Sequence, residues 1–438
     1  NSGIAASINE DTVQGHRDDT IRSGAWLCDQ DIVSIRISSA LKHISQLEQW
    51  GLNFRRDLEG LPFTEHAFGH NSARITSAGD STARQLQQIL EEQCIKRGIL
   101  RRGDYFVLDL VSTSNQINGL IALDMVEGKI VPMQCKTLII ADGGFEGAWN
   151  ISGSSGRGMQ LAMGQGIGLK NMEFQSWSPF YISGNKTSLP LGIIANGGTI
   201  VTSSGEDYAV DLSSTSNDIC VKMSQSGNSF GIDAKSMNGD TNVWYSSTAA
   251  MLNNRFGISL TEDVVPISPS LESTLGGIPV DENCRAIIDD WNRWFTGLYA
   301  VGESACSGMH GASLASGNRI LDAISGGAAA GDHAGKWAIG AEFSGSANIE
   351  EVCEKLTQQM SEQLSSDYND KSLRSRAVLT QLSDIMNSSM GLSRDGGNLT
   401  SAITTLNNLQ NSMSDVRLDD TNMTMNQDLV NKLELEGL

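Results

Sequence analysis

Two strand-like segments of this 438-residue chain end in glycine, and each could bring backbone atoms close to a bound ligand. The first covers residues 136–144 and ends in Asp142-Gly143-Gly144, and the second covers residues 297–304 and ends in Gly302-Glu303-Ser304. Glycine has no Cβ, so the backbone at these points can approach a bulky, flat group. Because open α/β sheets hold cofactors where strands end and helices begin, the pair indicates a cofactor site built from distant segments.

A third element of this pattern is the loop 310–317, after which a helix is predicted to begin at Asn318. The first turn of a helix carries a partial positive charge and can stabilise negative charge on a ligand. An acidic side chain at a strand end, such as Glu303, can accept hydrogen bonds from sugar hydroxyls. Each motif alone has a plainer interpretation, namely a tight turn, a solvated acid or a capped helix. Their order and spacing make the joint pattern informative.

The elements that position these motifs follow from the spacing of apolar residues. Helical periodicity predicts a helix over 31–52 and another over 83–98, the latter capped by Asp80, Ser81 or Thr82. Strands are predicted at 105–111, 119–125 and 130–133, with turns at Asn118-Gly119 and Glu127-Gly128. These strands form an antiparallel meander that leads into the buried strand over 136–144. A glycine-rich turn and helix follow at 151–170, and the pattern is helical from 348 onward.

Charge and cysteine usage exclude several classes of function. The chain has 51 Asp and Glu against 31 Lys and Arg, a formal charge of -20, which argues against nucleic acid as a partner. It also argues against unaided adsorption to an anionic membrane, although docking onto a partner subunit stays open. The seven cysteines show no CxxC spacing, which indicates reduced thiols in a cytoplasmic protein and predicts no metal site.

Several short motifs occur in an order that resembles the flavoprotein subunit of succinate dehydrogenase and fumarate reductase. The resemblance runs over essentially the whole chain. Its motifs lie at 19–31 (with Asp19-Thr20 and Asp29-Gln30-Asp31), at 142–144, at Gly276-Gly277-Ile278-Pro279, at 297–322 and at 425–436.

The resemblance implies an α/β fold in which a bipartite FAD/NAD(P)-binding, Rossmann-like domain is split by a capping domain and followed by a helical C-terminal domain. The implied boundaries are 1–168 and 266–340 for the two parts of the FAD-binding domain, 169–265 for the capping domain and 341–438 for the helical domain. No GxGxxG motif occurs in the sequence. The chain is therefore expected to be a fragment without the first βαβ unit, incomplete at its C-terminus and weak in its hold on FAD.

The same resemblance implies the residues that would contact FAD. Glu303 would hold the ribityl hydroxyls, and the helix that begins at Asn318 would face the flavin ring. FAD would be bound non-covalently, because Ser2 stands where the respiratory enzymes carry the histidine of covalent flavin. The implied cofactor-binding residues are Asp80, Gly143, Gly144, Glu303, Ser304, Asn318, Arg319, Ile320 and Leu321.

The side chains that the family uses to bind two carboxylates are not retained. Positions where the family carries His, Arg or Glu hold Ser178, Ile194, Asn196, Asp207, Glu272 and Leu314. Two new cations appear, since Arg319 replaces a serine and Arg157 an aspartate. A carboxylate at position 272 would repel a substrate carboxylate, so no catalytic residue can be assigned by resemblance.

The expected function is FAD-dependent oxidoreduction of a small dicarboxylate-like molecule, with electrons passed to an iron–sulfur subunit of a membrane-associated complex. This activity would belong to electron transport and the tricarboxylic acid cycle. One alternative is a catalytically silent structural paralogue in a respiratory complex. Another is an L-aspartate oxidase-like or other FAD-dependent enzyme with a remodelled pocket. The expected location is cytoplasmic, or peripheral on the inner face of the plasma or mitochondrial inner membrane through partner subunits.

Overall fold

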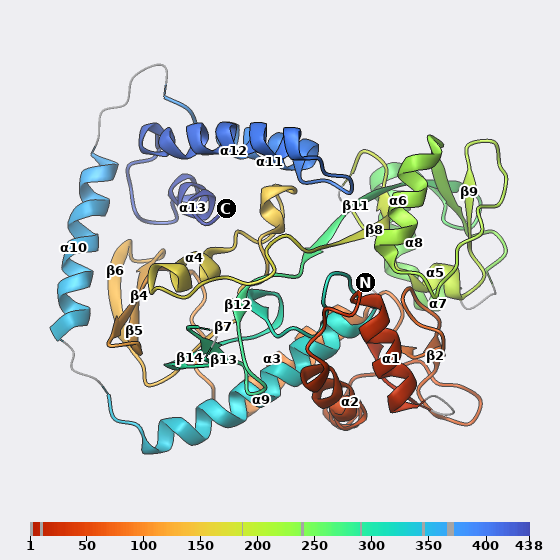
Figure 1. Ribbon diagram of the computed structural model, residues 1–438, viewed down its shortest axis with the longest axis horizontal. Helices are drawn as coiled ribbons and strands as arrows, with labels where there is room; N and C mark the ends of the chain where they lie inside the picture. The colour runs from red at the N-terminus through yellow and green to blue at the C-terminus, as the bar shows by residue number, and fades with distance from the viewer. Residues whose placement is uncertain are drawn as a thin grey trace. The chain divides into compact units, whose positions relative to one another are not determined.

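The chain folds into two compact units, each assembled from segments far apart in the sequence (Figure 1). This computed structural model describes residues 3–8, 12–185, 187–237, 241–289, 291–343, 347–365 and 372–438. The first unit comprises Asn1–Leu100, Phe174–Leu275 and Gly308–Ser325, and the second comprises Arg101–Glu173, Gly276–Ser307 and Gly326–Leu438. The four domain segments expected from the resemblance stay a prediction beside this two-unit division.

Three helices occupy the first hundred residues of the first unit: α1 (Val13–Ser23), α2 (Gln30–Trp50) and α3 (Thr82–Lys96). Both helices predicted in this region are confirmed. The side chain of Asp29 caps α2 by accepting hydrogen bonds from the N–H groups of Asp31 and Ile32, and Gly51 ends the helix at a φ of 110°. Ser81, one of the three predicted caps, precedes α3 but makes no side-chain capping bond.

Two antiparallel sheets complete the first unit. A small sheet has the order β1-β3-β2 (Ile4–Ala5, Ile75–Thr76, Thr64–Glu65), and a larger one has the order β8-β11-β10-β9 (Gln175–Ile182, Val264–Thr274, Phe230–Asp233, Thr199–Thr202). The segments that connect the strands of the larger sheet contain helices α5 (Gly192–Ala195), α6 (Ser216–Ser226), α7 (Thr241–Trp244) and α8 (Ser246–Phe256). Its apolar side chains, among them Phe180, Ile232 and Val265, form one buried core.

The second unit begins with the predicted meander, which the structure confirms as β4 (Tyr105–Thr113), β5 (Gln116–Asp124) and β6 (Lys129–Gln134). The predicted turn at Asn118-Gly119 is wrong, because both residues lie within β5. The chain reverses instead at Ser114 and Asn115, with φ angles of 51° and 60°. Asparagine tolerates this left-handed conformation, so the turn needs no glycine. The predicted turn at Glu127-Gly128 is confirmed.

The strands that carry the glycine motifs pair in parallel: β14 (Trp294–Ala300) lies beside β7 (Leu138–Ile140). A second parallel pair joins β12 (Ile278–Pro279) to β15 (Ala305–Cys306), and β13 (Arg285–Ile287) runs antiparallel to β14. The first motif strand is shorter than predicted and not fully buried, since Ile139 is 41% exposed. The helix after it is α4 (Arg157–Gly164), and the short 3₁₀ helices η1 and η2 cover Glu146–Ala148 and Gly302–Ser304.

Helices dominate the remainder of the chain, as predicted. Helix α9 (Asn318–Gly340) begins in the first unit and continues into the second. It is followed by α10 (Ala347–Leu364), α11 (Ser375–Ser389), α12 (Gly396–Asn411), η3 (Met413–Asp415) and α13 (Gln427–Leu435). Helix α10 packs along β4, β5 and β6 (Figure 1), where Ile349 joins a core with Leu108 and Ile121. Among the described residues, none of the helices has the length and apolar character needed to cross a bilayer.

Candidate functional site

The first glycine motif forms a tight, hydrogen-bonded turn in the second unit. The Asp142 carboxylate accepts hydrogen bonds from the N–H of Gly158 at 2.6 Å and from Ser304 Oγ at 2.9 Å. Ser304 Oγ also accepts a hydrogen bond from the N–H of Gly143 at 3.0 Å. The end of β7, the start of α4 and the end of β14 are therefore joined at one point. Of the predicted cofactor residues, Gly143, Gly144, Glu303 and Ser304 lie in this unit.

The glycines of this turn are required by its geometry. Gly143 has a φ of 97°, and a Cβ there would lie 2.4 Å from Ser154 Oγ. A Cβ at Gly158 would lie 2.5 Å from Asp142 Oδ1. A cavity of about 570 Å³ adjoins the turn, lined by Ile140, Ala141, Asp142, Ser154, Ser155 and Gly158 among others. The backbone is thus held close to a space large enough for part of a bulky ligand.

The second group of predicted residues lies at the N-terminus of α9 in the first unit. Asn318 is fully buried: its Oδ1 bonds to His16 Nε2 at 2.8 Å, and its Nδ2 donates to Thr20 Oγ1 at 2.9 Å. Leu321 is fully buried in the core with α2, and Ile320 packs against that core. These three side chains hold α9 in place, so Asn318, Ile320 and Leu321 would contact a ligand through backbone N–H groups only.

Asp80 lies elsewhere in the first unit, in the loop before α3. Its N–H donates to the carbonyl of Trp244 at 2.9 Å, and its carboxylate accepts from the N–H of Thr248 at 2.7 Å. The preceding Gly79 has a φ of 61°, and a Cβ there would lie 2.1 Å from the Trp244 carbonyl oxygen. Asp80 therefore joins the α3 loop to the α7–α8 region, which is a structural contact beside its predicted cofactor role.

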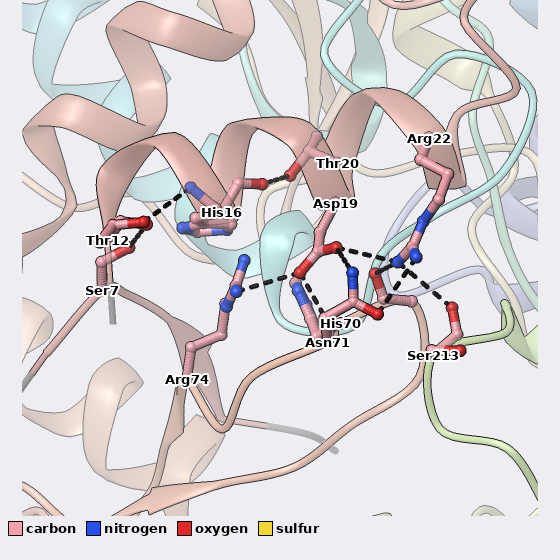
Figure 2. Close-up of polar contacts among 12 residues, drawn as sticks. Ser7, Thr12, His16, Asp19, Thr20, Arg22, His70, Asn71, Arg74 and Ser213 are labelled. Atoms are coloured by element: carbon pink, nitrogen blue, oxygen red, sulfur yellow. Dashed lines mark hydrogen bonds and ion pairs between the residues drawn. The ribbon is translucent and has the colours of Figure 1, made fainter. Parts of the chain in front are cut away.

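A buried ionic cluster forms around Asp19, in the C-terminal half of α1 (Figure 2). The Asp19 carboxylate binds Arg22 at 2.9 Å and Arg74 at 3.0 Å, and it accepts hydrogen bonds from the backbone and side chain of Asn71. Since Asp19 and Arg74 are almost fully buried, the pairing compensates for the cost of removing both charges from water. Asp19 of the Asp19-Thr20 motif, which is part of the resemblance, therefore links α1 to the segment that carries Asn71 and Arg74.

Two histidines lie beside this cluster, with ring centroids 5.6 Å apart. Burial lowers the pKa of His16 to about 3, an effect that the Asn318 hydrogen bond opposes and the Arg74 charge increases. Burial lowers the pKa of His70 well below its usual value, and the nearby charges of His16 and Arg74 add to the effect. Both rings are therefore neutral at pH 7.

A buried polar network in the first unit was missed by the sequence analysis. Arg55 binds Glu65 at 2.5 Å and donates from both terminal nitrogens to Asn196 Oδ1 at 3.2 Å. Asn196 in turn donates to Glu65 and to Tyr245 Oη. The Arg55 guanidinium also lies 4.8 Å from the centre of the Phe63 ring. No local signal marks this network, because its members come from three separate segments, 55–65, 196 and 245.

The six positions that the resemblance equates with the family's substrate-binding side chains all lie in the first unit. Ser178 sits in β8 opposite Ser270, Leu314 is buried, and Asp207 is exposed. Ile194 packs at the edge of the core of this unit. Glu272 lies 3.6 Å from Arg319, measured from Oε1 to Nη2. The two substitutions at positions 272 and 319 therefore bring an anion and a cation together.

Family models match most of the chain. The model described as "FAD binding domain" matches residues 2–320, and the model described as "Fumarate reductase flavoprotein C-term" matches residues 379–438. The chain belongs to the FAD-binding flavoprotein family of fumarate reductase and succinate dehydrogenase. The α/β fold class and the helical C-terminal region expected from the sequence are confirmed.

Relatives of this flavoprotein align along nearly its whole length. The Escherichia coli fumarate reductase flavoprotein subunit is 26% identical over 98% of this chain and 76% of its own length. The succinate dehydrogenase flavoprotein subunit of Rickettsia conorii is 25% identical over 100% of this chain and 78% of its own length. Among solved structures, Escherichia coli quinol fumarate reductase has the same fold, with a TM-score of 0.89 at 23% identity over 100% of this chain and 79% of that one.

The cofactor of this family is FAD, and the residues around the glycine turn fit it. A Cβ at Gly143 or Gly158 would collide with Ser154 or Asp142, so the turn needs both glycines to close. Asp142, Ser154 and Gly158 of this turn line the 570 Å³ cavity. The individual FAD contacts from Asp80, Gly144, Glu303 and Arg319 stay predictions. Ser2, the position of the covalent histidine in respiratory enzymes, lies outside the described residues. Among the described residues, no group of three or more His, Cys, Asp or Glu could hold a metal ion.

Proposed function

We propose that this flavoprotein is the FAD-dependent subunit of an oxidoreductase that removes electrons from a small carboxylate-bearing molecule and passes them to a partner protein. The observation that carries the proposal is the Asp142–Ser304 glycine turn, since it borders a cavity of about 570 Å³ within a chain of FAD-binding type. When bound, FAD supplies a site that accepts a hydride from the substrate. The glycine turn would position it, and Glu303 would accept hydrogen bonds from its ribityl hydroxyls.

The substrate is proposed to be less anionic than succinate or fumarate. Each charge-assisted hydrogen bond to a carboxylate contributes about 1.5–3 kcal/mol, and the side chain of Leu314 cannot make one. Glu272 adds a negative charge where a substrate carboxylate would be held. Losing two such bonds would weaken dicarboxylate binding by a factor of about 100 or more.

A catalytically silent subunit is the second candidate. It is favoured by the same substitutions, because Ser178, Glu272 and Leu314 offer neither a cation nor a proton donor matched to a dicarboxylate. An L-aspartate oxidase-like activity meets the same difficulty on the second carboxylate of its substrate. In all three cases the fold and the FAD site are kept, so only turnover separates them.

The partner is proposed to be a second subunit of a complex, because the relatives at 25–26% identity carry "flavoprotein subunit" in their names. An iron–sulfur protein suits the role, since the seven cysteines of this chain show no cluster spacing. Such a partner would place this flavoprotein at the inner face of a membrane.

The test is anaerobic bleaching of the flavin absorbance on protein shown to carry FAD. Succinate, malate, L-aspartate and L-alanine would each be added in turn, and dye-coupled turnover would be measured in parallel. Bleaching by one of them with turnover of ~1–10³ per second supports the oxidoreductase. Bound FAD that none of them bleaches favours the silent subunit. Succinate turnover within this range would contradict the proposed loss of dicarboxylate binding.

A further inference from the structure

Glu272 occupies an irregular point in the larger sheet of the first unit. In the pairing of β11 with β8, Leu271 lies opposite Trp177 and Ser273 opposite Ser176, so Glu272 is an extra residue without a partner on β8. Such a bulge re-aims the side chain of the extra residue and is over-represented near binding sites. Here the carboxylate is directed to within 3.6 Å of the Arg319 guanidinium.

The pair is accessible to a small molecule. The side chains of Glu272 and Arg319 are 21% and 29% exposed. Their 3.6 Å separation is longer than the 2.7–2.9 Å typical of a charge-assisted hydrogen bond. The Glu272 carboxylate therefore keeps the capacity to accept a short hydrogen bond from a ligand. Its charge also reaches Cys220, where it adds to the effect of burial in raising the pKa of that thiol.

Two hydroxyl groups next to the bulge lack partners among the residues that the structure describes. Ser176 and Ser273 face each other across the strand pair and are 1% and 0% exposed, and neither Oγ makes a hydrogen bond. Buried polar atoms are normally satisfied by protein, water or ligand. The Ser176–Ser273 pair beside Glu272 thus has two hydroxyl groups that can still form hydrogen bonds.

We propose that Glu272 and Arg319 form a binding site for a small zwitterion, in which Arg319 binds the ligand's carboxylate and Glu272 its protonated amine. An α-amino acid has the required pair of charged groups, both attached to the same carbon atom. A carboxylate without an amine would bind Arg319 but be repelled by Glu272. An amine without a carboxylate would bind Glu272 but be repelled by Arg319. The inference rests on the proposed function, of which it names the substrate class, but binding can be measured without turnover.

The experiment is calorimetric titration of the full chain with two matched pairs of ligands, L-alanine against propionate and L-aspartate against succinate. Each pair differs only in the ammonium group. Because one charge-assisted bond is involved, the amino acid of each pair should bind about 10-fold to 100-fold more tightly than its partner. FAD content and flavin bleaching would be recorded on the same preparations.

Variants then assign the preference to the pair. Glu272→Gln should abolish the preference for the amino acids, whereas Glu272→Asp, which keeps the charge, should retain most of it. Arg319→Gln should weaken all four ligands. The control is Asp332→Asn, which breaks an exposed ion pair with Lys336 and should change no ligand affinity. Thermal melting of each variant confirms that it is folded.

Equal affinities within each pair, no heat of binding for either amino acid, or a preference that survives in Glu272→Gln would each overturn the site. These results are separable from failure of the proposed function. A preference that depends on Glu272, with no flavin bleaching by any ligand, keeps the site and removes the oxidoreductase. Bleaching by substrates without any preference for the amine keeps the oxidoreductase and removes the site.

Discussion

Asn318 and His16 lie 302 positions apart in the sequence, yet Asn318 Oδ1 and His16 Nε2 are joined by a buried hydrogen bond of 2.8 Å. The same asparagine donates to Thr20, so one side chain fastens the start of α9 to α1. The helix terminus that the sequence assigns to the flavin is thus held in place by a residue whose own side chain is fully occupied.

Replacing Asn318 with Ala should lower the free energy of unfolding by about 2–4 kcal/mol, because His16 Nε2 loses its partner and Thr20 Oγ1 loses one of its two. Urea unfolding measures the change. Asn407→Ala, at an exposed position of α12, should cost no more than about 0.5 kcal/mol. Equal effects of the two substitutions would contradict a structural role for the buried asparagine.

The neutral, buried state of His16 should make stability depend on pH. Its pKa is about 3 in the folded protein, against an ordinary value of 6.5. Between these two pH values the imidazole is protonated in the unfolded chain but not in the folded chain. This contribution is complete above pH 6.5 and is lost as the pH falls toward 3. Between pH 7 and pH 5 the loss should be about 2 kcal/mol. Urea unfolding of the wild type and of His16→Asn should show the steeper pH dependence in the wild type, and identical slopes would refute the assignment.

The Arg55–Glu65 pair should be a major stabilising contact of the first unit. Arg55→Met leaves the Glu65 carboxylate buried without its cation, at a cost of about 3–5 kcal/mol. The neighbouring Arg56 pairs with Glu48 near the surface, and Arg56→Met should cost about 1 kcal/mol or less. Chemical unfolding of both variants gives the comparison. A smaller loss in Arg55→Met than in Arg56→Met would show that the network is not important for stability.

Gly143→Ala should reduce FAD binding, because a Cβ would press on Ser154 Oγ at 2.4 Å and the φ of 97° disfavours any side chain. The ratio of flavin to protein absorbance after purification measures occupancy. Gly205→Ala is a matched control: its φ is 83°, and nothing lies within 4 Å of the added Cβ. Full FAD occupancy in Gly143→Ala would place the cofactor away from this turn.

FAD should be released intact when the protein is denatured in acid, because Ser2 offers no imidazole for a covalent link. After precipitation, flavin fluorescence is expected in the supernatant and not in the protein pellet. Flavin that stays with the pellet would show a covalent bond through another residue.

The sequence by itself determined the family, the strand meander, the boundaries of α2 and α3 to within a few residues, and the start of α9. These features follow from local rules: apolar periodicity, capping residues and backbone angles that only glycine adopts readily. It placed the turn between β4 and β5 wrongly, because Asn115 can take the left-handed conformation that the prediction reserved for the Asn118-Gly119 pair.

The tertiary structure alone decided which charged and polar groups meet. Arg55 with Glu65 and Asn196, Glu272 with Arg319, and His16 with Asn318 each join segments that no local pattern connects. Their partners are chosen by how strands and helices pack, since a buried charge must find whatever opposite charge or donor the fold brings within reach. For this reason the sequence could identify the substitutions at positions 272 and 319, but only the structure could show that they face each other.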